Sequence, residues 1–205
     1  MVEAAGRSPR QSALGDLLGP HRIGSGAARP GVSLAERPGL AIWQISAWRE
    51  ADIAALRRAL AEQLGVTLPE GRAALSEGDV VLFRIAPRRW WLVRPEDWSS
   101  DLAARLVAAL TSRAAITDLS HARTVLRLSG PASENVLQRL CRIDLHPRAL
   151  PAGCVAQTLL GRVTALIHAL DDRPSFDLYL SRSLAYSTVE SLIDAADEFG
   201  LEIGG

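Results

Sequence analysis

The chain repeats one order of segments twice, and this repetition constrains its fold more than any other feature of the sequence. In each part an alternating apolar stretch precedes an amphipathic stretch, two further alternating stretches, a second amphipathic stretch and a short β-rich close. This order is that of a split βαβ unit. The sequence therefore predicts an α+β fold built from two ferredoxin-like halves, at about residues 39–115 and 116–205.

The first half carries clear helix signals. Apolar residues at helical spacing run from Ile53 to Leu64, and Gly65 is placed to end that helix in a left-handed conformation. Its other predicted elements are strands at 40–46, 80–85 and 90–93 and a helix that begins near Trp98. All five tryptophans belong to this half, and we expect such large rings to pack in a core or an interface: Trp43, Trp48, Trp90, Trp91 and Trp98.

The second half follows the same scheme with little identity to the first. A strand at 124–129 leads into a helix at Pro131, whose fixed backbone angle suits the start of a helix. The remaining predicted elements are a hairpin of 154–160 and 163–170 that turns at Gly161, a strand at 176–180, a helix capped by Ser183 and a last strand at 201–203.

Residues 1–38 differ from the rest of the chain. They are rich in Gly, Ala, Arg and Pro, and only Leu14, Leu17 and Leu18 form a short apolar cluster. A segment of this composition buries little surface, so we predict a flexible N-terminal arm before a domain at 39–205. An arm that orders on a partner surface, with 16–19 as a docking turn, is the alternative.

Charge and composition exclude several functions. The 23 basic residues balance 23 acidic ones, so no net field favours nucleic acid or an anionic membrane. All the basic residues are arginines. A chain without lysine lacks the lysine of a Walker-type phosphate loop and cannot form a Schiff base with pyridoxal phosphate.

Cysteine content and hydropathy indicate the compartment. Cys141 and Cys154 are too few and too far apart for a disulfide framework or a zinc ribbon, so we expect two reduced, apolar side chains. The first residues lack the pattern of a secretory signal, and no apolar run is long enough to span a bilayer. A cytoplasmic location fits best.

Candidate catalytic groups do not form a complete set. His121, His146 and His168 lack the spacing of a metal site, so a structural role is the expectation for each. Asp118 with His121 could form an acid–base pair, but both lie in a predicted turn, where local hydrogen bonds are common. No nucleophile elbow or dinucleotide-binding loop is present. A binding or assembly role is therefore favoured over a free-standing enzyme.

Several linked motifs resemble one family, the gamma subunits of heterotetrameric sarcosine oxidase. The motifs are 118–123 (Asp-Leu-Ser-His-Ala-Arg), 129–131 (Ser-Gly-Pro), 144–147 (Asp-Leu-His-Pro), 156–158 (Ala-Gln-Thr), 176–178 (Phe-Asp-Leu), 182–183 (Arg-Ser) and 198–200 (Glu-Phe-Gly). The likeness covers roughly residues 34–203. The strand, Gly-Pro and helix element is also similar to the folate-binding fold of glycine-cleavage T-protein.

The resemblance implies a subunit of a flavoenzyme that oxidatively demethylates sarcosine to glycine, reduces oxygen to hydrogen peroxide and passes the one-carbon unit to tetrahydrofolate. It implies FAD and covalent FMN on a beta subunit, NAD and a folate domain on alpha, and zinc on delta. The gamma chain would pack on alpha and bind no cofactor itself. No catalytic, cofactor-binding or metal residue in this chain follows from the resemblance.

The motifs supply candidate interface residues instead. These are Asp118, His121, Arg123, Asp144, His146, Arg148, Gln157, Asp177 and Arg182. We expect Arg123, Arg127, Arg148 and Arg182 to help form the interface with exposed tryptophans, because Arg and Trp are frequent interface anchors. Two alternatives stay open: the equivalent subunit of a complex acting on another N-methyl amino acid, such as an N-methylglutamate dehydrogenase, and an autonomous folate-binding one-carbon module.

Overall fold

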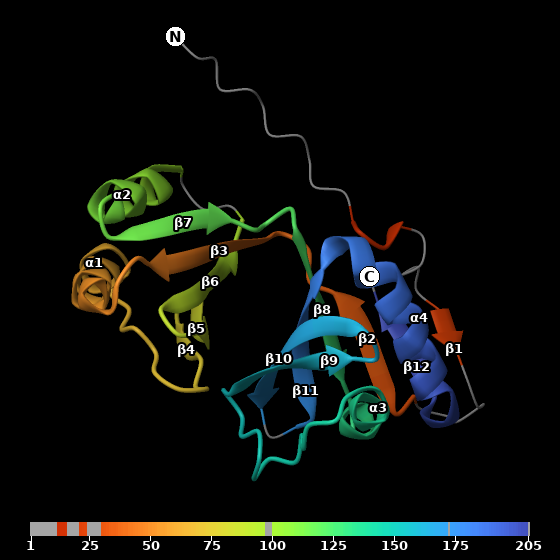
Figure 1. The fold of residues 1–205 in the computed structure, drawn as a ribbon. Coiled ribbons are helices and arrows are strands. Elements are labelled where there is room, and N and C mark those ends of the chain that lie inside the picture. Colours follow the sequence, from red (N-terminus) through yellow and green to blue (C-terminus); the bar gives the residue numbers. More distant parts are fainter. Residues whose placement is uncertain (1–11, 16–20, 24–29, 97–99, 172, 205) are drawn as a thin grey trace.

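The computed structural model describes residues 12–15, 21–23, 30–96, 100–171 and 173–204. These residues form two β-sheets that face each other, with helices on the two outer sides (Figure 1). The predicted 16–19 docking turn and Trp98 lie outside the described residues.

The smaller sheet has five strands in the order β4-β5-β6-β3-β7. Its strands are β3 (Leu40–Ala47), β4 (Leu75–Glu77), β5 (Val80–Ala86), β6 (Arg89–Pro95) and β7 (Ala114–Asp118). The larger sheet has seven strands in the order β1-β12-β2-β8-β11-β10-β9. Its strands are β1 (His21–Ile23), β2 (Val32–Glu36), β8 (Arg123–Ser129), β9 (Val155–Leu160), β10 (Val163–Asp171), β11 (Ser175–Ser181) and β12 (Leu201–Gly204).

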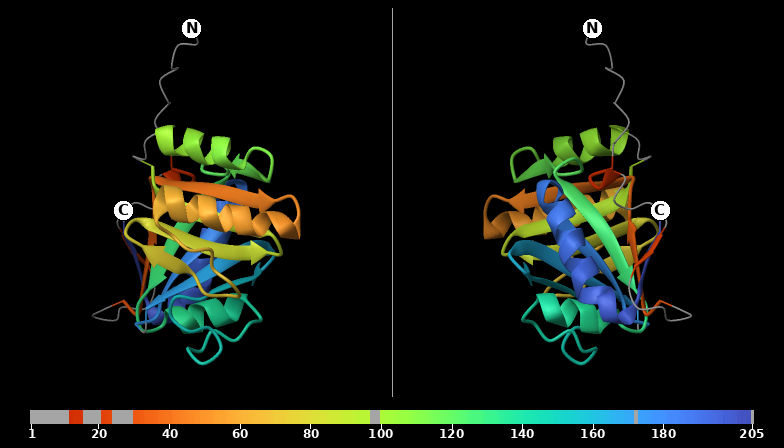
Figure 2. Two further views of the ribbon diagram at one scale, coloured as in Figure 1. Left: turned by 90° about the vertical axis from the view of Figure 1, so that its left-hand side faces the viewer. Right: turned by 90° about the vertical axis from the view of Figure 1, so that its right-hand side faces the viewer.

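Within the described residues, four α-helices cover the outer faces of the sheets. Helices α1 (Ile53–Leu64) and α2 (Ser100–Leu110) lie on the five-stranded sheet, and α3 (Ser133–Leu140) and α4 (Ala185–Ala196) lie on the seven-stranded sheet (Figure 1). The two side views show α1 lying across one sheet and α4 across the other (Figure 2). Short 3-10 turns flank the helices: η2 (Glu50–Asp52), η3 (Arg182–Leu184) and η4 (Asp197–Phe199).

Strand alternation divides the apolar residues among three cores. In β6, Trp90 and Leu92 pack under the helices, whereas Trp91 and Val93 point to the opposite sheet. Successive side chains of a strand point to opposite faces of the sheet. A strand that is buried on both faces therefore has a continuous run of apolar residues in its sequence. The middle core between the sheets joins residues of both halves, among them Phe83 and Tyr179.

The duplicated architecture predicted from the sequence is confirmed. The order β3-α1-β4-β5-β6-α2-β7 recurs as β8-α3-β9-β10-β11-α4-β12, and equivalent strands follow the same order across the two sheets, except that β2 separates β8 from β12. Gly65 ends α1 with φ +70°, as expected for a left-handed cap. Strand β7 closes the first sheet and continues to Asp118, so we place the division between the halves after 118 rather than at 115.

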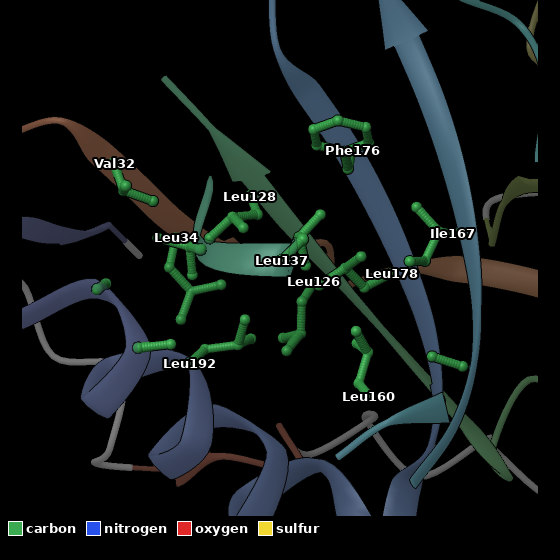
Figure 3. Packing of buried hydrophobic residues seen from close by; sticks show 14 of the residues in the cluster. Val32, Leu34, Leu126, Leu128, Leu137, Leu160, Ile167, Phe176, Leu178 and Leu192 are labelled. Atoms are coloured by element: carbon green, nitrogen blue, oxygen red, sulfur yellow. The ribbon is translucent and has the colours of Figure 1, made fainter. Parts of the chain in front are cut away.

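The prediction of a flexible arm is wrong for residues 32–36. They form β2, which lies between β8 and β12 and has no counterpart in the first sheet as far as the structure describes it. Val32 and Leu34 are buried beside Leu126 and Leu128 and across from Leu192 of α4 (Figure 3). Val32 and Leu34, two apolar residues at strand spacing, fill the space between β8, β12 and α4. The residues around them have the composition of a loop, so the sequence pattern did not indicate this strand.

The Ser129-Gly130-Pro131 motif makes the turn where β2 meets the second half. A Cβ on Gly130 would lie 2.5 Å from the Gly31 carbonyl oxygen, and the φ angle of Gly130 is +112°. Ser133 Oγ lies 2.8 Å from the carbonyl oxygens of both Gly130 and Pro174, which share its one hydroxyl hydrogen. Helix α3 therefore begins at Ser133, two residues after the predicted Pro131, and the motif is explained by close packing of backbone.

Gly130→Ala is expected to lower the free energy of unfolding by about 2 kcal/mol. About half of this comes from the left-handed backbone and the rest from the contact with Gly31. Gly161→Ala is the matched control, since Gly161 has φ +59° but a methyl group there would meet nothing within 4 Å. Urea unfolding of both variants measures the difference. Equal losses in free energy of unfolding would show that the contact of the new methyl group with the Gly31 backbone has no cost.

Candidate functional site

The structure places the nine candidate residues in three regions, and the first two adjoin because Arg123 and Arg182 line one cavity of about 260 Å³. Arg123, Gln157 and Asp177 lie between the sheets, together with Arg127. The second region is the entry to β8, with Asp118, His121 and Arg182. The third is the loop after α3, with Asp144, His146 and Arg148. The motifs follow one another along the chain, but their side chains do not all meet at one site.

A buried ion pair occupies the face between the sheets. Arg127 on β8 and Asp177 on β11 are paired directly in the strand register, and Asp177 is paired in turn with His168 on β10. Arg127 donates from Nε to Oδ1 and from Nη2 to Oδ2 of Asp177, both at 2.8 Å. Asp177 is 5% exposed, and its hydrogen bond raises the pKa of Arg127. This bidentate geometry is the strong form of an arginine–carboxylate contact.

His168 lies beside this ion pair and is 4% exposed. Burial lowers the pKa of His168, with a smaller opposing effect of Asp177 and a smaller lowering effect of Arg127. Within the part of the chain that the structure describes, its Nδ1 atom has no hydrogen-bond partner. A structural hydrogen-bonding role was the expectation for this residue, and the structure leaves that nitrogen unused by the fold.

The stability of the chain is expected to fall as the pH drops below about 6.5, and His168→Phe should remove part of that fall. The unfolded state binds a proton near the ordinary histidine pKa of 6.5, whereas native His168 binds it only at lower pH. Its contribution is therefore fully present above pH 6.5 and is lost as the pH falls through the lower folded pKa, at up to about 1.4 kcal/mol per pH unit.

Urea unfolding at about pH 8 and about pH 5 measures this effect. At the higher pH both states are neutral at His168, so the difference between wild type and variant there reports packing alone. If the difference in free energy of unfolding between wild type and His168→Phe is the same at the lower pH, His168 is not the titrating group.

Aromatic rings form the rest of the face between the sheets. Phe83 lies 6.0 Å from Trp91 and 5.3 Å from Tyr179 between ring centroids. The Arg123 guanidinium lies 4.9 Å from the Trp91 ring centroid, and burial lowers the pKa of Arg123. Gln157 and Arg123 line a small cavity of about 50 Å³ beside Trp91. Burial, followed by the charge of Asp177, raises the pKa of Tyr179, so its phenol stays neutral.

Asp118 and His121 are held by the turn between β7 and β8. Asp118 Oδ1 accepts the backbone N–H of Ser120 at 2.8 Å, and Ser120 Oγ accepts the backbone N–H of Ile42 at 3.0 Å. Both Asp118 and His121 are described, and no hydrogen bond or ion pair joins them. His121 instead lines an open hollow of about 540 Å³ with Arg182.

The loop after α3 shows the same kind of local bonding. Asp144 Oδ1 accepts the backbone N–H of His146 at 2.9 Å, and His146 Nδ1 accepts the backbone N–H of Arg148 at 3.2 Å. All three side chains are exposed. The Asp-Leu-His-Pro motif therefore shapes a turn, in keeping with the usual role of Asp in such segments.

The described residues offer neither a clustered metal site nor a membrane-spanning helix. Among them, no group of three or more His, Cys, Asp or Glu residues could hold a metal ion. None of the described helices has the length and apolar character needed to cross a bilayer.

Comparison with known proteins gives a consistent set of relatives. The family model of the GCVT N-terminal domain matches residues 66–205. A sarcosine oxidase subunit gamma from Corynebacterium sp. (strain P-1) is 38% identical over 148 residues, which is 70% of this chain and 71% of the relative. The subunit of the same name from Arthrobacter sp. is 39% identical over 145 residues, covering 69% of this chain and 70% of the relative.

Solved structures agree with the sequence relatives. A chain of the heterotetrameric sarcosine oxidase from Corynebacterium sp. U-96, in complex with pyrrole 2-carboxylate, superposes with a TM-score of 0.78 at 26% identity, covering 94% of this chain and 97% of that one. The glycine cleavage system aminomethyltransferase T from Bartonella henselae shares the fold, with a TM-score of 0.60 at 18% identity over 84% of this chain and 48% of that one.

Proposed function

Because the chain belongs to the family of sarcosine oxidase gamma subunits, we propose that it is the gamma subunit of a heterotetrameric sarcosine oxidase. The observation that carries this proposal is the likeness along nearly the whole of both chains to a chain of the Corynebacterium enzyme. The match extends over 94% of one chain and 97% of the other, so it concerns the entire two-sheet fold and not a single shared motif.

The reaction belongs to the complex in this proposal. The oxidase would demethylate sarcosine to glycine, form hydrogen peroxide and pass the one-carbon unit to tetrahydrofolate. FAD, FMN, NAD, tetrahydrofolate and zinc would be held by the alpha, beta and delta companions, in the cytoplasm. The state of the candidate groups supports a non-catalytic role for this chain: Asp177 is occupied by Arg127, and Asp118, Asp144 and His146 serve local turns.

We further propose that assembly, most directly with alpha, uses the surface formed by Arg182, Leu184 and Tyr186. Leu184 and Tyr186 are 43% and 52% exposed, and they follow Arg182 within about one turn of η3 and α4. An arginine beside exposed aromatic and aliphatic side chains is typical of a binding hot spot. Arg148 and the 56% exposed Trp48 are further exposed candidates, whereas Arg127 is bonded to Asp177.

Co-purification tests the function. A tagged chain expressed with the alpha, beta and delta chains is expected to retain a large flavoprotein and its yellow absorbance, whereas the chain purified alone should be colourless. Capture of no flavin-containing partner would contradict the assembly role.

The double variant Arg182→Ala/Tyr186→Ala is expected to weaken this capture by about 30-fold, the effect of losing about 2 kcal/mol at an interface hot spot. Val107→Ala is the matched control, since Val107 is 48% exposed but lies on α2 of the other half. If the double variant still captures its partner, the interface lies on another surface, and Trp48 is the next residue to test.

A second candidate function is an autonomous folate-binding module, favoured by the match to the GCVT N-terminal domain. Calorimetry of tetrahydrofolate with the isolated full-length chain distinguishes it, since a purely assembling subunit should release no binding heat. Substrate assays of the purified complex with sarcosine and N-methylglutamate separate the oxidase from a sister complex.

A further inference from the structure

A pocket of about 280 Å³ opens between the two sheets and takes no part in the assembly surface proposed above. We call it the inter-sheet pocket. The side chains that matter most are Arg37, Arg94, Arg127, His168, Asp177 and Tyr179. At ~30 Å³ per water molecule, the space would hold about nine waters, which is the scale of a small organic molecule.

Positive charge predominates in the inter-sheet pocket. Its lining has three guanidinium groups, from Arg37, Arg94 and Arg127, but only two carboxylates, from Asp177 and the exposed Asp79. The bidentate pair with Arg127 already uses both oxygens of Asp177. An anionic ligand would therefore meet a favourable field in a partly enclosed space.

Arg37 is the guanidinium best placed to bind such an anion. Its Nη1 atom lies 3.9 Å from Asp177 Oδ2, which is beyond hydrogen-bond distance, and its side chain is 37% exposed. The fold uses the backbone of this residue instead, because the Arg37 N–H donates to the Val125 carbonyl oxygen at 2.8 Å. Its side-chain donors can thus engage a ligand without breaking a hydrogen bond that the fold requires.

His168 supplies a second reason to expect a ligand. It lines the same pocket, is almost completely buried, and its Nδ1 atom has no partner among the described residues. Buried polar atoms in native proteins are nearly always satisfied, and an exception calls for a bound molecule or water. A ligand with a polar group near its anionic end would satisfy this nitrogen.

The remaining lining selects for an organic ligand. Val81, Val93, Leu170 and the ring of Tyr179 give the pocket an apolar side. An inorganic anion would leave that side uncovered, whereas a compact apolar body attached to a carboxylate would fill it. Small-molecule sites commonly combine an apolar lining with a few convergent polar groups.

We propose that the inter-sheet pocket binds a small organic carboxylate. Arg37 pairs with the carboxylate, Arg94 and Arg127 add positive charge, and His168 Nδ1 bonds to the carboxylate or to a polar group beside it. The apolar residues of both sheets hold its body. Because both halves contribute, the ligand would also join the two sheets. This inference does not depend on the proposed function.

Calorimetry with the full-length chain tests the proposal, with sodium benzoate as the probe. Benzamide is the neutral control of equal shape, and sodium phosphate at equal ionic strength is the inorganic control. We expect saturable binding of benzoate, at least about 10-fold tighter than that of benzamide, because only the carboxylate forms charge-assisted bonds. Equal binding of the two probes, or saturable binding of phosphate but not benzoate, would overturn the proposal.

Arg37→Gln is expected to weaken benzoate binding at least about 10-fold. The matched control is Arg57→Gln, because Arg57 lies on the outer helix α1 and pairs with Glu70, and this variant should bind as wild type does. Unchanged affinity in Arg37→Gln would refute the assignment. Circular dichroism checks that both variants are folded.

A second measurement needs no change at Arg37. The imidazole NMR signals of His168, identified by their loss in His168→Phe, should shift on addition of benzoate to the wild-type chain. The signals of exposed His146 should not shift. An unshifted His168 at saturating benzoate would place any bound carboxylate elsewhere.

Discussion

Replacement of Phe83 by alanine is expected to lower the free energy of unfolding by about 3–5 kcal/mol, the range for removal of a buried phenyl ring. Phe83 is fully buried in the core between the sheets. Its ring contacts Trp91 of its own sheet and His168 and Tyr179 of the other, at centroid distances of 6.0, 6.2 and 5.3 Å. The cavity would therefore open where the two halves meet.

Urea unfolding followed by tryptophan fluorescence and by circular dichroism measures this loss. Phe83→Leu keeps most of the volume and should cost less than about 1.5 kcal/mol, and Leu159→Ala, at a side chain that is 53% exposed, should change stability by less than about 0.5 kcal/mol. Both probes should report one transition, because the middle core belongs to both halves. A small loss in Phe83→Ala would show that the sheets are not packed as one unit.

The secondary structure of the two halves was predictable because local patterns determine it. The stripe from Ile53 to Leu64 has one apolar face, and the run from Trp90 to Val93 has a strand's alternation with both faces apolar. Strand β2 was not predictable because residues far away in the sequence, and not its local pattern, determine it. Its five residues follow a segment rich in Gly, Ala and Arg, and the strands beside it come from residues 123–129 and 201–204.

The polar face between the sheets could not be predicted from spacing. Arg127 was expected at an interface, but its partner Asp177 is 50 residues away in the chain. Only the pairing of β8 with β11 makes these residues neighbours. The histidine beside them is easier to recognise in retrospect, since His168 interrupts an otherwise apolar strand. An ionisable residue within a strand that is apolar on both faces is the sequence signal that could have indicated this site.

Asp177→Leu is expected to lower the free energy of unfolding by about 3 kcal/mol. It removes the carboxylate that neutralises Arg127 and lies within 3.9 Å of Arg37. Loss of one partner of a buried ion pair costs about 3–5 kcal/mol, and the lower end applies because the two arginine side chains are 35% and 37% exposed. Urea unfolding near neutral pH measures the change.

A double-mutant cycle separates the cost of an unpaired charge from the net value of the pair. Asp177→Leu/Arg127→Met should recover to within about 1 kcal/mol of wild type, because apolar side chains of similar size can replace a buried ion pair at little cost. Arg57→Met is the control, since it breaks a pair with Glu70 whose partners are 51% and 76% exposed, and should cost less than about 1 kcal/mol. If the double variant instead loses the sum of the two single losses, Arg127 and Asp177 contribute independently, and the contact between them is not what stabilises the face between the sheets.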